Sequence, residues 1–376
     1  MLEHWFANYM ICLVLAVLLT GMIIPNIMKI AFKKKLFDEV NERKIHHGVV
    51  PRLGGISFLP AFMFAFCCVI GFNIRIDAEC TTDLMTNVVM PLFFLLCAMM
   101  LLYLVGIADD LVGVRYRAKF LFQIIAGCLI VISGTWINSF YGFLRIEEIP
   151  SWLGWLITIF SVIYVTNAIN LIDGIDGLAS GLSIMALAFY SVVFFGCGEY
   201  IYALLAGATL GTLIPFFYFN VFGKAERHNK IFMGDTGSLT IGLVMSFLSI
   251  EVFNIQDSAL ANSGNLMVLA IAPIIVPCFD VVRVFIHRVR RKKNPFLPDK
   301  CHIHHKLLAL GWNQKQALVS ILLTDCAFIL ANYILSGILN PTVIIVGDII
   351  IWSAMNILLT AAIRKREKAF GVTLYE

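Results

Sequence analysis

The chain has 376 residues, of which 60% are hydrophobic and only 14% are charged, and its formal net charge at pH 7 is +4. Soluble proteins carry about 25% charged residues, and the mean hydropathy here is +0.88. These values exclude a soluble globular protein and predict an all-α, polytopic integral membrane protein. The ten cysteines lie mostly inside apolar runs without zinc-site spacing, so no disulfide framework is expected.

The apolar runs predict about eleven transmembrane helices, because each span needs about 20 apolar residues. We interpret the first run as a retained span and not a cleaved signal peptide, since Glu3 is acidic and no small-residue cleavage site follows. The predicted spans cover residues 9–31, 54–74, 88–108, 119–137, 150–169, 177–197, 200–221, 236–254, 264–286, 316–336 and 341–363.

Basic residues predict the orientation of these spans. If the N-terminus lies outside, the inward segments hold 24 of the 28 Lys and Arg residues, and only Arg75 and Arg145 face outward. Cytoplasmic loops carry such an excess, so we expect the N-terminus outside and the C-terminus in the cytoplasm. Nearly all polar motifs fall in the inward loops, which predicts a single domain over 1–376 with a cytoplasm-facing site. These inward loops are 32–53, 109–118, 167–177, 222–238 and 287–315.

The stretch from Tyr164 to Ser183 carries polar residues at strict three-residue spacing between two apolar runs. Residues three apart are neighbours on a helix, and ionisable groups at a membrane edge are costly and indicate function. Glycines between them allow close approach of backbone or ligand. We expect metal or phosphate binding here; the alternative is a polar loop between two spans. The polar residues are Asn167, Asn170, Asp173 and Asp176.

Asp109 and Asp110 end the third predicted span. Adjacent side chains on a regular helix diverge by about 100°, so the two carboxylates converge on one ion only if the helix ends there, as Gly113 allows. Paired acids bind hard cations such as Mg²⁺. Lys119 and two arginines follow and suit an anionic substrate. The alternative is a solvated acidic turn followed by ordinary inner-side charges.

Asp235 lies where an apolar span resumes, within FMGDTGS at 232–238. Backbone amides at a helix start can hold an anion, and the carboxylate can hold a cation. The competing interpretation of Asp235 is a helix N-cap. Phe232 could stack on a planar base, although an aromatic residue at a membrane interface is also ordinary.

Two further inward loops contain basic motifs. In the first, His46 and His47 precede Arg52 and a glycine pair, and Arg52 could meet a phosphate. In the last, three histidines follow a basic run. Three histidines invite a zinc interpretation, but no fourth ligand is evident locally, and donors to a diphosphate fit better. These histidines are His302, His304 and His305.

Several charged residues lie inside predicted spans. Asp280 and Arg283 are three apart and should pair with each other. Asp325 and Asp348 lie in the last two predicted spans and could pair with polar groups of the bundle. No mechanism follows for Asp325 or Asp348 from the sequence.

Five motifs together resemble the polyprenyl-phosphate N-acetylhexosamine-1-phosphate transferases. They occur in the family's order, and each lies on the predicted inward side. HIHH resembles the N-acetylglucosamine-type branch, whereas the MurNAc-pentapeptide translocase branch usually has three consecutive histidines. The motifs are PRLGG at 51–55, DDLVG at 109–113, NAINLIDGIDGLASG at 167–181, FMGDTGS at 232–238 and HIHH at 302–305.

The resemblance implies a reaction in the bacterial cytoplasmic membrane. A UDP-linked N-acetyl sugar, with UDP-GlcNAc first, donates its sugar-1-phosphate to undecaprenyl phosphate and releases UMP, which begins envelope glycans such as O-antigen or teichoic acid. It also implies Mg²⁺, with Mn²⁺ as the alternative, and admits a homodimer. No nucleic-acid partner is expected. The alternatives are another donor, such as UDP-MurNAc-pentapeptide, or an ion-coupled transporter.

The resemblance also implies residue roles. Asp235, Asn170 and Asp173 would hold the metal, and Asp109 and Asp110 would lie near the acceptor phosphate. Asp176 and Phe232 resemble positions near the uracil. The remaining expected substrate contacts are Arg52, Lys119, Asn167, His302, His304 and His305.

Overall fold

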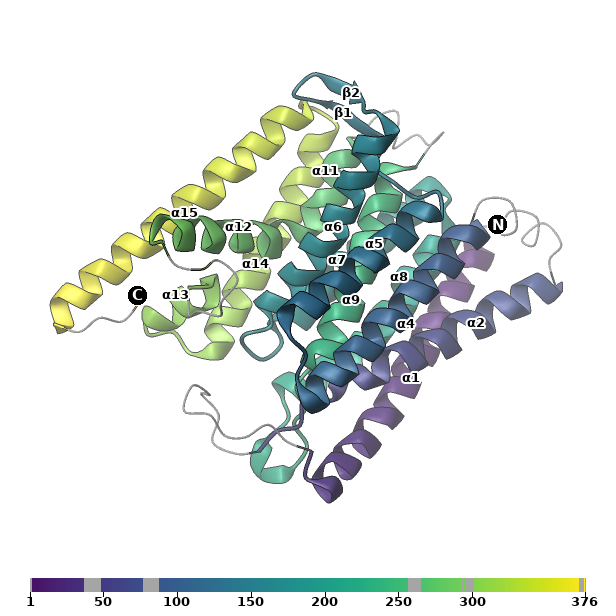
Figure 1. Ribbon diagram of the computed structural model, residues 1–376, viewed down its shortest axis with the longest axis horizontal. Coiled ribbons are helices and arrows are strands. Elements are labelled where there is room, and N and C mark those ends of the chain that lie inside the picture. The colour runs from purple at the N-terminus through teal and green to yellow at the C-terminus, as the bar shows by residue number, and fades with distance from the viewer. Residues whose placement is uncertain are drawn as a thin grey trace.

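The computed structural model describes residues 2–36, 49–76, 88–255, 265–292, 294, 301–371 and 375 (Figure 1). His46, His47 and part of the predicted inward loop at 32–53 lie outside the described residues. The elements are α1 (Leu2–Lys34), η1 (Gly54–Ser57), α2 (Phe58–Ile76), α4 (Val89–Val112), α5 (Tyr116–Ile132), β1 (Ser139–Phe143), β2 (Ile146–Glu148), α6 (Ser151–Ile172), α7 (Leu178–Cys197), α8 (Tyr200–Val221), η3 (Ala225–Arg227), α9 (Gly234–Phe253), α11 (Leu266–Ile271), η4 (Ala272–Ile274), α12 (Ile275–Arg290), α13 (Ile303–Ala309), α14 (Gln314–Ser336) and α15 (Pro341–Phe370).

The described chain has ten helical segments that are long and apolar enough to cross a membrane. They coincide with ten of the predicted spans, and α5, at the predicted span 119–137, is a helix of 17 residues. The prediction of an all-α polytopic membrane protein is confirmed. The one departure is a small antiparallel hairpin of β1 and β2, which occupies the predicted loop at 138–149.

The polar motifs meet at one end of this bundle. In Figure 1, α1 and α15 run in the same direction, so the two termini lie at opposite ends. The hairpin marks one end, where the Leu144 main-chain N–H donates to Thr342 Oγ1 (2.8 Å) at the start of α15. The motif-bearing ends of α4, α5, α6 and α9 lie at the other end (Figure 1). Which end faces the cytoplasm stays a prediction.

Helix α9 lies at the centre of the bundle, and its apolar stretch is entirely buried. Small residues allow its neighbours to approach closely, as is usual between membrane helices. A Cβ added at Gly106 of α4 would lie 2.4 Å from Thr236 Cα, and one added at Gly242 would lie 2.7 Å from Thr166 Cα of α6. The N-terminal half of α9 is therefore held against α4 and α6.

The predicted span at 264–286 is broken into α11, η4 and α12. Pro273 and Pro277 lie at the break, and proline cannot donate the backbone hydrogen bond that a continuous helix needs. Beyond the break, α12 lies across its neighbours in Figure 1. It carries Asp280 to α13, which contains the histidine motif.

Candidate functional site

The Asp110 carboxylate accepts hydrogen bonds from the N-terminal residues of α9. Its Oδ1 accepts from the Asp235 main-chain N–H (2.7 Å), and its Oδ2 accepts from the Thr236 N–H (2.9 Å) and hydroxyl (2.5 Å). The first N–H groups of a helix have no partner within it, and a carboxylate there is also favoured by the helix dipole. The N-cap function proposed as an alternative for Asp235 is therefore performed by Asp110, and that interpretation of Asp235 is wrong.

Asp109 points to a different partner from Asp110. Lys119 Nζ lies 2.6 Å from Asp109 Oδ2 and 2.7 Å from Asp235 Oδ2. The three side chains are only 11% to 25% exposed. Helix α4 continues through both acids to Gly113, so the two carboxylates diverge as a regular helix requires, and the described structure does not direct them at one ion. Lys119 instead joins the acids of α4 and α9.

The polar residues of the Tyr164–Ser183 stretch reach three different partners. Asn170 Nδ2 donates to Asp235 Oδ1 and to Ser238 Oγ (2.8 Å for the second). Asn167 Nδ2 instead donates to Gln123 Oε1 of α5 (2.7 Å). Successive positions three apart turn by about −60° around a helix. Thus Asn170 joins the Asp235 cluster, whereas Asn167 contributes to packing between α5 and α6.

Asp173 follows the last residue of α6. Desolvation by the surrounding protein raises the pKa of its carboxyl above the usual range, Arg52 opposes the rise, and Asp176 and Asp110 add to it. The residue is also exposed to solvent. Asp173 is thus in electrostatic contact with both neighbouring motifs, although no hydrogen bond joins it to Asp235 within the described residues.

Asp176 pairs with a lysine that the sequence analysis did not select. Lys230 Nζ lies 2.5 Å from Asp176 Oδ2, with the two side chains 11% and 13% exposed. The same ammonium lies 5.9 Å from the centre of the Phe232 ring. In the sequence Lys230 is one of the inward basic residues. Its place two residues before Phe232 is the only feature that connects it with the FMGDTGS motif.

The PRLGG motif packs directly against FMGDTGS. The Phe232 N–H donates to Pro51 O, and the Gly54 N–H donates to Phe232 O, each at 2.9 Å. Gly234 has φ +73°, and a Cβ there would lie 2.2 Å from Arg52 O, so only glycine fits. The main chain of Arg52 therefore supports the start of α9, while its side chain is exposed.

Asp280 holds the histidine motif in place. It pairs with Arg283 (2.7 Å), as predicted, and its Oδ2 lies 2.8 Å from His302 Nδ1. It also accepts from the Ile303 N–H at the start of α13 (3.2 Å). His302 is thereby committed to Asp280, an anchoring role that sequence reasoning missed for this acid.

His304 connects this motif to the Tyr164–Ser183 stretch. It is 1% exposed, and a Cβ added at Gly174 would lie 2.2 Å from its Nε2. Neither ring nitrogen has a hydrogen-bond partner within the described residues. Burial, and then the adjacent His305 ring 4.2 Å away, lowers the pKa of His304 to about 3. A neutral imidazole thus lies against the turn after Asp173.

The described residues contain no group of three or more His, Cys, Asp or Glu side chains that could hold a metal ion. Mg²⁺ does not require such a group, because it is usually bound by one or two carboxylates together with waters and substrate phosphates. Asp235 and Asn170, which are in contact, and Asp173 offer oxygen donors of the kind that it prefers.

The two intramembrane acids left open by the sequence differ in their contacts. Asn332 Nδ2 donates to Asp348 Oδ2 (2.9 Å), which joins α14 to α15 as expected. Asp325 is fully buried in α14, and no side chain of the described residues donates a hydrogen bond to it.

The fold and the site together define a polytopic membrane protein with clustered acids, amides and lysines at one end of its bundle. Its residues 92–253 match the sequence model of glycosyl transferase family 4. The chain is 30% identical over 303 residues, 78% of this chain and 75% of the relative, to an undecaprenyl-phosphate alpha-N-acetylglucosaminyl 1-phosphate transferase of Yersinia pestis.

Two further relatives have related names. The Salmonella typhi protein of the same name is 31% identical over 306 residues, which cover 81% of this chain and 77% of that protein. A probable undecaprenyl-phosphate N-acetylglucosaminyl 1-phosphate transferase of Bacillus subtilis is 29% identical over 374 residues, 98% of this chain and 97% of that protein. The chain belongs to this family of polyprenyl-phosphate N-acetylhexosamine-1-phosphate transferases, as its five motifs predict.

Proposed function

We propose that the protein transfers an N-acetylhexosamine-1-phosphate, with GlcNAc-1-phosphate first, from a UDP-sugar to undecaprenyl phosphate. The relatives' names support a sugar-phosphate transferase acting on undecaprenyl phosphate. The observation that carries the proposal is the Asp109–Lys119–Asp235 ion-pair chain, which joins three helices at the end of a membrane bundle. There a cytosolic donor and a membrane-bound acceptor can meet.

The reaction is a phosphoryl transfer. An oxygen of the lipid phosphate attacks the sugar-bearing β-phosphorus, the bond from that phosphorus to the oxygen bridging the α-phosphate breaks, and UMP leaves with its electron pair. A phosphate monoester has a second pKa near 6, so the acceptor is already largely dianionic at neutral pH and barely needs a general base. Catalysis then rests on positioning and charge stabilisation.

The contacts of the two adjacent acids favour direct attack over a phospho-aspartate. Both oxygens of Asp110 are occupied by the start of α9, and Asp109 is paired with Lys119 and also accepts from the Val114 N–H (2.5 Å). In this proposal Asp110 positions Asp235, and Asp109 orients Lys119. Phosphate-labelled Asp109 or Asp110, trapped during turnover, would overturn direct attack.

Mg²⁺, or Mn²⁺ in its place, would be held by Asp235 with Asn170 and Asp173. When bound, it supplies positive charge to the diphosphate and the departing UMP. Lys119, a cation of the protein itself, lies between Asp109 and Asp235 and would contact the donor phosphates as well.

The donor would extend from this cluster over neighbouring motifs. The uracil ring would lie beside the Phe232 ring and the ion pair of Asp176 with Lys230. His304, next to Gly174, and His305 would face the diphosphate or the sugar. We assign Arg52 to a phosphate, because its exposed side chain can reach outward while its main chain supports α9.

The membrane side is part of the proposal. The inward segments predicted from the sequence hold 24 of the 28 Lys and Arg residues, and such an excess marks the cytoplasmic face. We therefore place the site on the cytoplasmic face of the bacterial cytoplasmic membrane, where the product would initiate an envelope glycan.

The test is UMP release by purified protein with undecaprenyl phosphate and a panel of UDP-sugars, with and without Mg²⁺. We expect release with UDP-GlcNAc that requires both lipid and metal. Asp235→Asn should reduce release by at least about 10²-fold, the cost of removing one charge-stabilising group. Glu226→Gln, which changes an exposed acid of the same inward loop, should not.

The outcomes separate the alternatives. Release only with another UDP-sugar, such as UDP-MurNAc-pentapeptide, would keep the reaction and replace the donor. No release with any donor from well-folded protein in lipid would refute the transferase proposal.

A further inference from the structure

A small pocket lies outside the cluster around Asp235, where α12, α13 and α15 meet. Its volume is about 150 Å³, and its charged lining consists of Arg283, Arg291, Lys306, Arg364 and Glu367. Four cations therefore line the pocket against one acid. Asp280, which pairs with Arg283, supplies a second negative charge beside it and still leaves a net excess of two positive charges.

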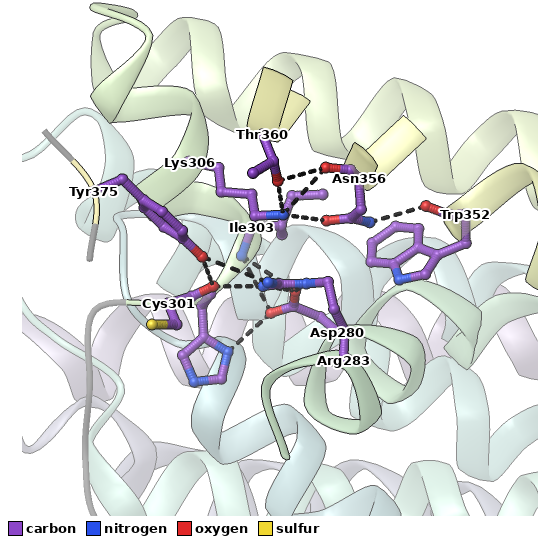
Figure 2. Close-up of polar contacts among 10 residues, drawn as sticks. Asp280, Arg283, Cys301, Ile303, Lys306, Trp352, Asn356, Thr360 and Tyr375 are labelled. Carbon is purple, nitrogen blue, oxygen red and sulfur yellow. Dashed lines mark hydrogen bonds and ion pairs between the residues drawn. The ribbon is translucent and has the colours of Figure 1, made fainter. Parts of the chain in front are cut away.

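Lys306 is the buried member of this pocket, at 4% exposure. Its ammonium donates to three acceptors on α15: Asn356 O (3.3 Å), Asn356 Oδ1 (3.1 Å) and Thr360 Oγ1 (3.0 Å) (Figure 2). All three acceptors are neutral. An ammonium that is removed from water is costly without a charged partner, and no carboxylate of the described residues lies within ion-pair distance of Lys306.

Arg283 is held by several polar contacts. Its guanidinium pairs with Asp280 and donates to Cys301 O (2.5 Å), as Figure 2 shows. The Tyr375 hydroxyl donates to the same carbonyl (2.7 Å). One wall of the pocket is thus formed by Arg283 and Tyr375, which are hydrogen-bonded to the same carbonyl. Arg291 and Arg364 contribute exposed guanidinium groups at the edge of the pocket.

We propose that this pocket binds a phosphate group, carried by an anionic membrane lipid or free in solution. Guanidinium groups match the geometry of phosphate oxygens. Lys306 has no anionic partner among the described residues, and a phosphate would supply one. Basic pockets between transmembrane helices on the cytoplasmic side bind anionic lipid headgroups, and this pocket lies beside the basic C-terminal ends of α12 and α15.

The size of the pocket excludes the sugar nucleotide as its occupant. Sites for drug-sized ligands have volumes of about 300–1,000 Å³, whereas this pocket has about 150 Å³. It accommodates one small anionic group. The inference therefore does not depend on the proposed transferase reaction, and its test uses binding rather than turnover.

The test compares two pairs of substitutions on the same two helices. Arg291→Gln with Arg364→Gln removes two lining charges, and Arg290→Gln with Lys365→Gln removes two exposed charges that do not line the pocket. Delipidated protein in neutral detergent would be titrated with phosphatidylglycerol, phosphatidylcholine or inorganic phosphate. Native mass spectrometry would count retained lipids, and thermal unfolding would report phosphate binding.

We expect wild type and the control pair to retain phosphatidylglycerol in preference to phosphatidylcholine, and the pocket pair to bind it about 25-fold more weakly, since each basic residue near an anionic lipid contributes about fivefold. Stabilisation by inorganic phosphate that only the pocket pair loses would identify free phosphate as the source. Equal losses in both pairs, or no response to either anion in wild type, would overturn the proposal.

Discussion

Asp110→Asn tests whether this acid positions α9 or reacts with substrate. The carboxylate accepts three hydrogen bonds from the first two residues after Gly234. An asparagine keeps one carbonyl oxygen for the Asp235 N–H, and the Thr236 hydroxyl can rotate to accept from the new amide group. The Thr236 N–H has no such freedom and is left facing another donor.

The expected loss of stability follows from the Thr236 N–H, which is left without an acceptor. Leaving a buried N–H without a partner costs about 1–3 kcal/mol, and losing a negative charge at a helix N-terminus costs about 0.3–1 kcal/mol more. We therefore expect Asp110→Asn to lower the thermal unfolding midpoint clearly. Displacement of Asp235 by a fraction of an ångström should reduce turnover by about 10- to 100-fold, since a 1 Å misplacement costs about 10².

A double-mutant comparison separates positioning from chemistry. Thr236→Val removes one hydrogen bond to Asp110 without touching the carboxylate, and in a positioning role its effects on turnover and stability should overlap with those of Asp110→Asn, because contacting residues are non-additive. The assay is single-turnover UMP release with thermal unfolding of each variant. Wild-type stability of Asp110→Asn with turnover below 10⁻⁴ of normal, beside an unaffected Thr236→Val, would refute the positioning role.

Three further predictions concern the neighbouring motifs. Lys230→Met removes the ammonium that pairs with the mostly buried Asp176 carboxylate and should raise KM for the UDP-sugar about tenfold or more, with KM for the lipid unchanged. An equal rise for both substrates in steady-state assays would contradict this. Gly174→Ala would force its Cβ into His304 and should lower both turnover and the unfolding midpoint, whereas Gly71→Ala, in open space on α2, should lower neither. His304 has a pKa lowered to about 3, so its contribution to stability is complete above its unfolded pKa near 6.5 and is lost as pH falls, by about 2 kcal/mol at pH 5. His304→Gln should therefore show a smaller drop in unfolding midpoint between pH 7 and pH 5 than wild type. Equal drops in the two proteins would remove His304 as the cause.

The sequence predicts the bundle well because membrane spans depend on a one-dimensional property. Apolar length alone marks a helix in a membrane, and the ten long segments are found where the hydropathy places them. Two departures have local causes. Pro273 and Pro277 break the ninth predicted span by removing backbone donors, and the hairpin of β1 and β2 has too few residues to give a pattern.

The candidate site is predicted less completely, because a motif reveals which residues matter and not which residues they face. Asn167 and Asn170 are indistinguishable in the sequence, yet one faces Gln123 and the other Asp235. The difference arises from helical rotation combined with the placement of α5 and α9. Likewise, Asp109 and Asp110 are equivalent as letters but are directed to a lysine and to a helix start.

The lysines show why this limit is greatest for basic residues. An inward Lys is already explained by membrane orientation, so its presence alone does not reveal which acid it pairs with. Lys119 and Lys230 nevertheless each pair with acids in the site, at distances of 2.5 to 2.7 Å. Lys306 is buried more deeply than either but donates hydrogen bonds only to neutral acceptors. The rule that assigns basic residues to one side of the membrane therefore does not reveal which of these lysines pair with an acid. Nor does it reveal that Lys306 has no anionic partner in the described part of the chain, and this difference appears only once the helices are packed.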